Sequence, residues 1–308
     1  MIKLYKVENN LSREVKTIAS TDWVNVYEPT KEELDFLRLK LKLDKELIDY
    51  CLDENEISRV ITKDNKKVVL IDVPVIDKKR DSLFYTVSLA IIIEENKVYT
   101  ICSKEYLGLE DFYTNKISSG TSTAEFLLNL MDRITISYLN NLKTMNNQAN
   151  KIERTLKKST KNKEMFKLMN ISKSLVYLRT SLIANARVFE LISNDKELIN
   201  TDEKEEHISN IIIENRQANE TASIYSEILN GMMDAFASIV NNNLNLIMKF
   251  LAGATIVFSI PTMIASFMGM NLDLGQFATN PYAALYVIIL SLVLAMIVAY
   301  ILKKKNML

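Results

Sequence analysis

The sequence predicts an α+β membrane protein with an N-terminal cytosolic α/β domain, a long helical stalk and two C-terminal transmembrane helices. Over residues 1–120, short β-branched runs alternate with charged stretches, and residues 121–249 show apolar residues at helical spacing. Residues 250–308 begin with a long apolar region: up to residue 302 the only charged side chain is Asp273, although the 308-residue chain has a net charge of +0. These composition changes divide the chain into three parts.

The N-terminal part reads as a mixed α/β domain. "KKVVLIDVPVI" and "YTVSLAIII" have the short β-branched cores of buried strands, and "NKVYTICS" follows after a turn at "EENK". "TKEELDFLRLKL" and "DKELIDYCLD" are predicted helices, with Thr30 and Asp44 as N-caps and acidic residues in the first turn.

The middle part reads as three helices. "TAEFLLNLMDRITISYLNNLKTMNNQANKIERTL" and "MFKLMNISKSLVYLRTSLIANARVFELI" have helical spacing, and the polar stretches "KKSTKNKE" and "SNDKELINTDEKEE" interrupt the pattern. A third periodic segment runs from about His207 to Met268, which corresponds to roughly 90 Å at ~1.5 Å per residue. Because a helix of this length cannot be packed inside one small domain, we expect it to enter the membrane.

Two uncharged runs, Phe250–Met268 and Tyr282–Leu302, have the length that a bilayer core of ~30 Å requires. Lys249 precedes the first run, three lysines follow the second, and the loop at 272–281 has no Lys or Arg. The positive-inside rule therefore predicts a multi-pass protein of the cell membrane with both termini in the cytoplasm. The N-terminus lacks the apolar region of a signal peptide, which agrees with this topology.

A polar or small stripe follows one face of the long helix into the first span. Two helices per chain cannot enclose a pore, but several copies of this helix around an axis would line one. Met248 and Leu251 would then form an apolar constriction of the kind that gates by dewetting. Each Ser or Thr alone could simply bond its own helix carbonyls. Alternating steps of four and three residues give the members of the stripe: Asp234, Ser238, Asn241, Asn245, Met248, Ala252, Thr255, Ser259, Thr262 and Ser266.

The end of the first span carries Gly269-Met270-Asn271, a tripeptide placed between two C-terminal spans. Together with Pro261 in the first span, the short outer loop and the basic tail, this pattern resembles the CorA-type magnesium transporters, also known by their GMN motif. The resemblance covers the layout of the whole chain and is closest from Tyr225 to Asn271. It implies a funnel-shaped homopentamer in the lipid membrane that conducts Mg²⁺ down its electrochemical gradient.

The resemblance also implies roles for individual residues. Gly269, Met270 and Asn271 would form the outer selectivity filter, and Asn245 and Thr262 would form rings deeper in the pore. Mg²⁺ prefers oxygen ligands and gives up water reluctantly, so neutral amide oxygens can bind its water shell and still release it. Glycine would permit an unwound backbone at the filter.

The family further implies that Mg²⁺ is also a regulatory ion, bound between cytosolic domains of neighbouring subunits so that the pore closes. Asp234 matches the acidic position on the long helix. Its partner is expected in the α/β domain, where Asp77 in "VIDKKRD" is the first choice and Asp81 the second.

Three positions depart from the family pattern. Met268 replaces the tyrosine that precedes Gly-Met-Asn, and Asp273 is the only acid in the outer loop, so ion capture from outside would be weaker. The helical hairpin around "KIERTLKKSTKNKE" is basic, whereas it is acidic in the relatives considered.

Other functions fit less of the sequence. A Zn²⁺ or Co²⁺/Ni²⁺ transporter on the same scaffold remains open, although Met270 favours Mg²⁺ because zinc exporters tend to carry Gly-Ile-Asn. A membrane-anchored coiled-coil scaffold would not need the polar stripe. The zero net charge gives no support for nucleic-acid binding, and Cys51, Cys102 and His207 have no metal-ligand spacing. Without a nucleophile–base pair or a phosphate-binding loop, we do not expect an enzyme.

Overall fold

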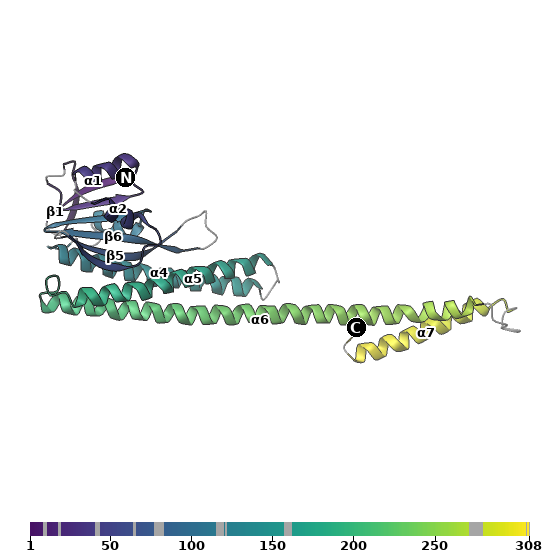
Figure 1. The fold of residues 1–308 in the computed structure, drawn as a ribbon. Coiled ribbons are helices and arrows are strands. Elements are labelled where there is room, and N and C mark those ends of the chain that lie inside the picture. The colour runs from purple at the N-terminus through teal and green to yellow at the C-terminus, as the bar shows by residue number, and fades with distance from the viewer. Residues whose placement is uncertain are drawn as a thin grey trace. The chain divides into compact units, whose positions relative to one another are not determined.

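The computed structural model describes residues 1–8, 11–17, 20–40, 44–63, 66–76, 83–114, 120, 122–156, 162–270, 280–305 and 307. The chain separates into two compact units, Met1–Met233 and Asp234–Leu308, and the division falls inside one long helix. The boundaries expected at residues 120 and 249 mark changes of composition and remain predictions. Figure 1 shows how the elements of the first unit are arranged.

A seven-stranded sheet forms the centre of the first unit, with the strand order β2-β1-β3-β7-β6-β5-β4. Neighbouring strands are antiparallel except β3 and β7, which pair in parallel. The strands are β1 (Ile2–Glu8), β2 (Leu11–Glu14), β3 (Trp23–Tyr27), β4 (Arg59–Lys63), β5 (Lys66–Val75), β6 (Tyr85–Glu94) and β7 (Lys97–Cys102). The turn predicted at "EENK" is confirmed as a two-residue connection between β6 and β7, with Glu95 at a φ of 51°.

Two short helices follow β3, and the sequence predicted both. α1 spans Lys31–Lys40 and α2 spans Lys45–Leu52. Thr30 caps α1 as expected: its Oγ1 accepts from the Glu33 amide at 3.3 Å, while the Thr30 amide donates to Glu33 Oε2 at 2.8 Å. The N-cap prediction for Asp44 was right in position but wrong in mechanism. The Asp44 carboxylate accepts from Lys63 Nζ at 2.7 Å and makes no cap hydrogen bond, because β4 presents this ammonium group to it.

The hydrophobic core lies on both faces of the sheet. On one face, α1 and α2 contribute Leu37, Leu47 and Cys51 to a cluster with strand residues such as Val68 and Ile92. Near the other end of the sheet, Trp23 stacks on Tyr5 at 4.6 Å and meets Phe126 at 5.2 Å. A 3₁₀ turn, Leu107–Leu109, and the short α3, Glu110–Tyr113, follow β7. Cys51 and Cys102 are buried free thiols.

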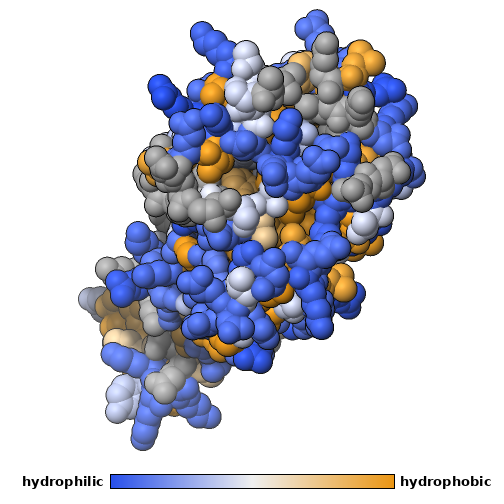
Figure 2. Space-filling model, turned by 90° about the vertical axis from the view of Figure 1, so that its left-hand side faces the viewer, coloured by the Kyte–Doolittle hydropathy of each residue, from blue (hydrophilic) through white to orange (hydrophobic). Residues whose placement is uncertain are grey.

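Two long helices lie beneath the sheet, α4 (Thr123–Leu156) and α5 (Asn162–Ser193), and the start of α6 packs below them (Figure 1). The contacts of α5 with the sheet are unusually polar. Ser174 Oγ accepts from the Phe84 amide at 3.0 Å, and Ser181 Oγ donates to Thr86 Oγ1 at 2.8 Å. Asn185 bonds both backbone groups of Asp72 at 2.9 Å. The face of this unit seen in Figure 2 is mostly hydrophilic.

α6 spans Asp202–Met268, 67 residues, or about 100 Å at ~1.5 Å per residue. It begins about five residues before the predicted start. Thr201 Oγ1 accepts from the Lys204 amide at 3.4 Å, and three acids occupy the first turn, where the helix dipole favours negative charge. The charged run "DEKEE" therefore starts the helix instead of interrupting the pattern. The second C-terminal helix, α7, spans Ala283–Lys304.

Candidate cation pathway on the C-terminal helices

The second unit consists of the last part of α6 and the whole of α7. Both helices are long and apolar enough to cross a membrane, yet only 6% of the most apolar window of α6 and 17% of that of α7 are buried within the chain. The core helix of a water-soluble protein would be covered on most sides. This much exposed apolar surface is expected for a pair of helices that lipid and other copies of the protein would cover.

The contact between α6 and α7 uses small residues. α7 runs back beside the end of α6 (Figure 1), and on it Ser291 and Ala295 are buried with one helical turn between them. On α6, Gly253 is buried, whereas Val257 and Ile260 are half-buried. Small side chains let two helices approach closely in a membrane. This contact defines the side of α6 that faces α7.

The predicted polar stripe lies on a different side of α6. Every residue of the stripe is exposed. The part of the stripe within the span lines a shallow depression of about 740 Å³, in which Thr255, Ser259, Thr262 and Ser266 lie beside Phe258, Met263, Phe267 and Met270. α7 therefore leaves the polar side of the first span uncovered. Polar side chains at membrane depth usually face the interior of a bundle or a water-filled path.

The hydroxyl groups of the stripe bond their own helix, which was the alternative interpretation of each one. Thr255 Oγ1 donates to the Leu251 carbonyl at 2.8 Å, Ser259 Oγ to the Ile256 carbonyl at 2.8 Å, and Thr262 Oγ1 to the Phe258 carbonyl at 3.0 Å. Each hydroxyl has one proton and two lone pairs, so a group that donates inward can still accept from outside. The stripe therefore presents hydrogen-bond acceptors, which fit the outward-pointing protons of a hydrated cation and disfavour an anion.

α6 ends in a tightened turn. The Gly269 amide donates to the carbonyls of Ala265 at 3.0 Å and Ser266 at 3.2 Å, and the Met270 amide donates to Phe267 at 3.3 Å. The φ of Gly269 is not in the left-handed region, and a Cβ would meet its nearest neighbour at an ordinary 3.5 Å. The expected unwound backbone at the filter stays a prediction, because residues 271–279 lie outside the described residues. Asn271 lies outside the described residues.

The structure describes only one of the acids predicted to form the regulatory site, so that site stays a prediction. Asp234 is exposed on α6, while Asp77 and Asp81 lie outside the described residues. Across the part of the chain that the structure describes, no group of three or more His, Cys, Asp or Glu side chains could hold a metal ion. The constriction residues Met248 and Leu251 are both exposed, at 57% and 58%.

Sequence reasoning missed the apolar residues that flank the stripe. Phe258, Met263 and Phe267 line the same depression as the hydroxyl groups. Phe258 and Met263 lie three to four residues from stripe members, and Phe267 lies four residues after Met263, so helical spacing could also have found them. Bulky apolar side chains beside the polar groups would narrow any path that several copies enclose.

A family model described as "CorA-like Mg2+ transporter protein" matches residues 19–304 of this chain. The chain belongs to the CorA-like Mg²⁺ transporter family. One relative is the cobalt/magnesium transport protein CorA of Methanocaldococcus jannaschii, which is 29% identical over 291 residues, 92% of this chain and 90% of that protein. The magnesium transport protein CorA of Helicobacter pylori is 22% identical over 296 residues, with the same coverage of 92% and 90%.

Solved structures agree with this assignment. The complete structure of the CorA magnesium transporter from M. jannaschii matches with a TM-score of 0.83 and 26% identity, over 98% of this chain and 96% of that one. The full-length CmaX protein matches at 16% identity with a TM-score of 0.69, over 98% of this chain and 97% of that one, and this likeness shows the fold alone. The predicted architecture of an α/β domain, a long helix and two C-terminal membrane helices is confirmed, and the chain is a membrane protein of the CorA family.

Proposed function

We propose that this protein is a channel that carries divalent cations, Mg²⁺ above all, into the cell down the electrochemical gradient. The observation that carries the proposal is the part of the stripe within the first span: the hydroxyl oxygens of Thr255, Ser259, Thr262 and Ser266 form an uncharged, exposed row of acceptors in a CorA-family chain. Mg²⁺ keeps its water shell unless the site supplies near-ideal octahedral oxygen ligands. A path lined by hydroxyl and amide oxygens lets the hydrated ion pass without complete dehydration.

The filter is assigned to Gly269, Met270 and Asn271 and the inner rings to Asn245 and Thr262, on the basis of the family resemblance. Asn271 follows directly after the tightened turn that ends α6, so its amide would lie at the outer mouth. A neutral ring binds a hydrated cation weakly enough to release it, which conduction requires.

The working assembly is a homo-oligomer, for which the family resemblance favours five copies. One chain contributes a single polar stripe, so a closed path needs several chains. In the membrane, both termini are assigned to the cytoplasm because Lys249 and Lys303–Lys305 flank the spans on that side. A doubly charged ion crossing 100 mV gains about 4.6 kcal/mol, twice the ~2.3 kcal/mol for one charge. The membrane potential alone can therefore drive uptake.

The filter is tested by substituting Asn271 with alanine and measuring Mg²⁺ uptake into liposomes. We expect the Asn271→Ala protein to assemble in membranes but to lose uptake, because it loses the acceptor oxygen. The matched control is Asn280→Ala: Asn280 Oδ1 only accepts from the nearby Tyr282 amide at 2.9 Å, so uptake should persist. Wild-type uptake by Asn271→Ala would contradict the filter assignment.

A second candidate cargo is Co²⁺, because the M. jannaschii relative is named a cobalt/magnesium transport protein. Competition in the same liposomes separates the two: a magnesium channel keeps its Mg²⁺ flux when Co²⁺ is present at equal concentration. Flux of Co²⁺, Ni²⁺ or Zn²⁺ that exceeds Mg²⁺ flux would transfer the assignment to a transition-metal carrier on the same scaffold.

A further inference from the structure

The outer face of α5 is apolar and basic. Among residues 165–189 every charged side chain is basic, namely Lys167, Lys173, Arg179 and Arg187, and all four are exposed. Exposed apolar side chains lie among and beside them at helical spacing, and Glu164 and Glu190 flank the basic stretch. The apolar residues are Phe166, Met169, Val176, Tyr177, Ile183 and Leu191, with 43–64% of each residue exposed. We name this surface the α5 face.

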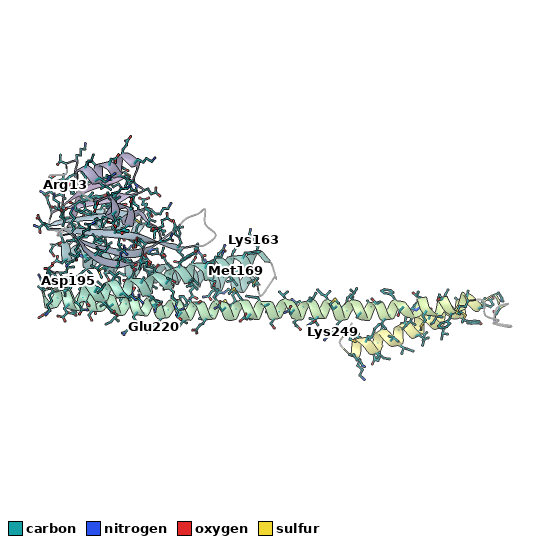
Figure 3. All side chains as sticks on the ribbon, in the orientation of Figure 1. Arg13, Lys163, Met169, Asp195, Glu220 and Lys249 are labelled. Carbon is teal, nitrogen blue, oxygen red and sulfur yellow. The ribbon has the colours of Figure 1, made fainter. Side chains whose placement is uncertain are left out.

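The outer face of α6 in the first unit is apolar and acidic. Ile213, Ile224 and Ile228 are about half exposed, and Ile213 and Ile224 lie on the side opposite the buried Ala218 and Ala222. Ile228 also lines a narrow pocket with Ile171 and Leu175 of α5. Three exposed acids lie beside the isoleucines along the helix, and Arg216 is the exposed base among them. The acids are Glu206, Glu220 and Glu227, and in Figure 3 the labelled Glu220 lies on the side of α6 away from the other helices. We name this surface the α6 face.

The two helices are antiparallel neighbours, and one hydrogen bond fixes their relative height. Asn215 Nδ2 of α6 donates to the Leu182 carbonyl of α5 at 3.0 Å. Both helices rise ~1.5 Å per residue. Because they run in opposite directions, the residue n positions before Leu182 on α5 lies at the same height as the residue n positions after Asn215 on α6. Met169 is then level with Ile228, and Lys173 lies level with Ile224, midway between Glu220 and Glu227.

The same levels match at the other end of the pair. Ile183 lies next to the level of Ile213, and Arg187 lies between the levels of Glu206 and Glu214. Lys173 and Arg187 of the α5 face thus lie within about one helical turn of acids on α6, and Met169 and Ile183 lie at or next to the levels of isoleucines. Within one chain the two faces lie on neighbouring helices, and most of their side chains are exposed. In a closed ring the copies are rotated but not shifted along the axis, so a face of one copy meets the other face of its neighbour at the same levels.

We propose that the α5 face of one copy packs on the α6 face of the next copy, in a ring whose axis runs along these helices. Such a head-to-tail contact closes a ring and needs no twofold symmetry. Pairing a face with its own kind is disfavoured, because two α6 faces bring acids together and two α5 faces bring bases together. The inference rests on the proposed function only in requiring several copies.

The contact is tested in the full-length protein in membranes by disulfide formation between Met169→Cys and Ile228→Cys in the same chain. Mild oxidation should give a ladder of covalent dimers, trimers and larger species, and the longest species gives the ring size. Native Cys51 and Cys102 are buried and should not contribute. Each single variant alone should give no ladder, because the proposed contact joins unlike faces.

The matched control combines Met169→Cys with Ser209→Cys. Ser209 is also exposed on α6 but lies 19 residues from Ile228, about 28 Å away along the helix, so no ladder should form. A disulfide closed within one chain, no disulfide, or an equal ladder from the control would each overturn the proposed contact. The size of the undisturbed protein is measured in parallel. An oligomer without a ladder overturns this contact alone, whereas a monomer also overturns the proposed channel.

The charges give an independent test. Adding Lys173→Glu and Arg187→Glu to the Met169→Cys, Ile228→Cys protein should lower the yield of the ladder about tenfold, because like charges then face each other. Adding Glu220→Lys and Glu227→Lys to that variant should restore the ladder. A reversal that leaves the yield unchanged, or a loss that the second reversal does not repair, would contradict the charge complementarity.

Discussion

At the scale of single residues, the polar contacts between α5 and the sheet hold a buried acid. Burial raises the pKa of Asp72, although hydrogen bonds from Ser181 and Ser58 oppose the shift. Asn185 bonds the backbone of the same residue, and Tyr138 donates its hydroxyl to the Asp72 carbonyl at 3.0 Å. Asp72 therefore links β5 to both long helices through its backbone groups, while its buried carboxyl group titrates.

Replacing Asp72 with asparagine should reduce the loss of stability at higher pH. Because the pKa of Asp72 is raised in the folded protein, its favourable contribution is complete below the ordinary aspartate pKa and is lost as the pH rises through the folded value. Asp72→Asn removes this titration, so its melting temperature relative to wild type should increase from acid to neutral pH. Thermal unfolding between pH 3 and 7 measures the difference, and a constant difference would contradict the assignment.

Asp195 serves as the control with the opposite sign. Burial acts to raise its pKa, but the hydrogen bond and charge of Lys67 outweigh burial, and the pKa is lowered. Its contribution is therefore present above the ordinary aspartate pKa and lost as the pH falls. The melting temperature of Asp195→Asn relative to wild type should therefore fall from acid to neutral pH. That of Asp72→Asn should rise over the same range.

The hydroxyl groups of the stripe make a second prediction at this scale. Thr255→Val with Thr262→Val keeps the shape of the helix but removes two acceptors in every copy. At about 1 kcal/mol for each lost hydrogen bond, Mg²⁺ flux should fall about tenfold or more. The conservative pair Thr255→Ser with Thr262→Ser keeps the oxygen atoms and should retain flux. Equal flux in the valine and serine variants would mean that this side of α6 does not face the ion.

At the scale of elements, long periodic helices were easy to predict and short polar strands were not. The first long helix was predicted to span residues 123–156, as α4 does. The strands β1, β2, β3 and β4 were not singled out, because charged or polar residues interrupt each of them. In β3, Asn25 is buried, and its side-chain oxygen accepts from Thr100 Oγ1 of the parallel strand β7 at 2.9 Å. A partner 75 residues away cannot be seen in a local pattern.

The proposed constriction is a property of one short part of α6. Met248 and Leu251 are bulky, and exposed in the single chain, beside neighbours of the stripe that are polar or small. Met248→Ala with Leu251→Ala should increase Mg²⁺ leak at high Mg²⁺, because a wider constriction stays wet. Leu246→Ala is the matched control, since Leu246 is similarly exposed on another side of the helix. If the double variant leaks no more than Leu246→Ala, the gate lies elsewhere.

At the scale of the whole molecule, the stripe could be proposed because helical spacing and span length are local properties of one chain. The predicted regulatory site would join acids from neighbouring copies, and the spacing of residues within one segment does not indicate which acids would meet. Asp234 is placed by the structure on an exposed side of α6, whereas the choice of Asp77 over Asp81 still rests on the family resemblance.

The feedback hypothesis makes the last prediction. In a packed ring the Asp234 carboxylates and the acids of neighbouring α/β domains repel one another, and Mg²⁺ bound between copies would offset this repulsion and favour the closed state. An ion shifts the equilibrium only by the difference in its affinity for the two states. Asp234→Asn with Asp77→Asn should therefore weaken the Mg²⁺ dependence of both gating and protease sensitivity.

The control for this pair is Asp35→Asn with Asp49→Asn, which removes the same charge from two exposed acids of α1 and α2. If general loss of negative charge were the cause, the Mg²⁺ dependence of protease protection would change in both double variants. If loss of a bound ion is the cause, it changes only in the Asp234, Asp77 variant. The measurement is the Mg²⁺ concentration that gives half-maximal protection from protease in membranes. If Mg²⁺ protects the Asp234, Asp77 variant at the wild-type midpoint, these residues do not hold the ion, and Asp81 becomes the partner to test with Asp234.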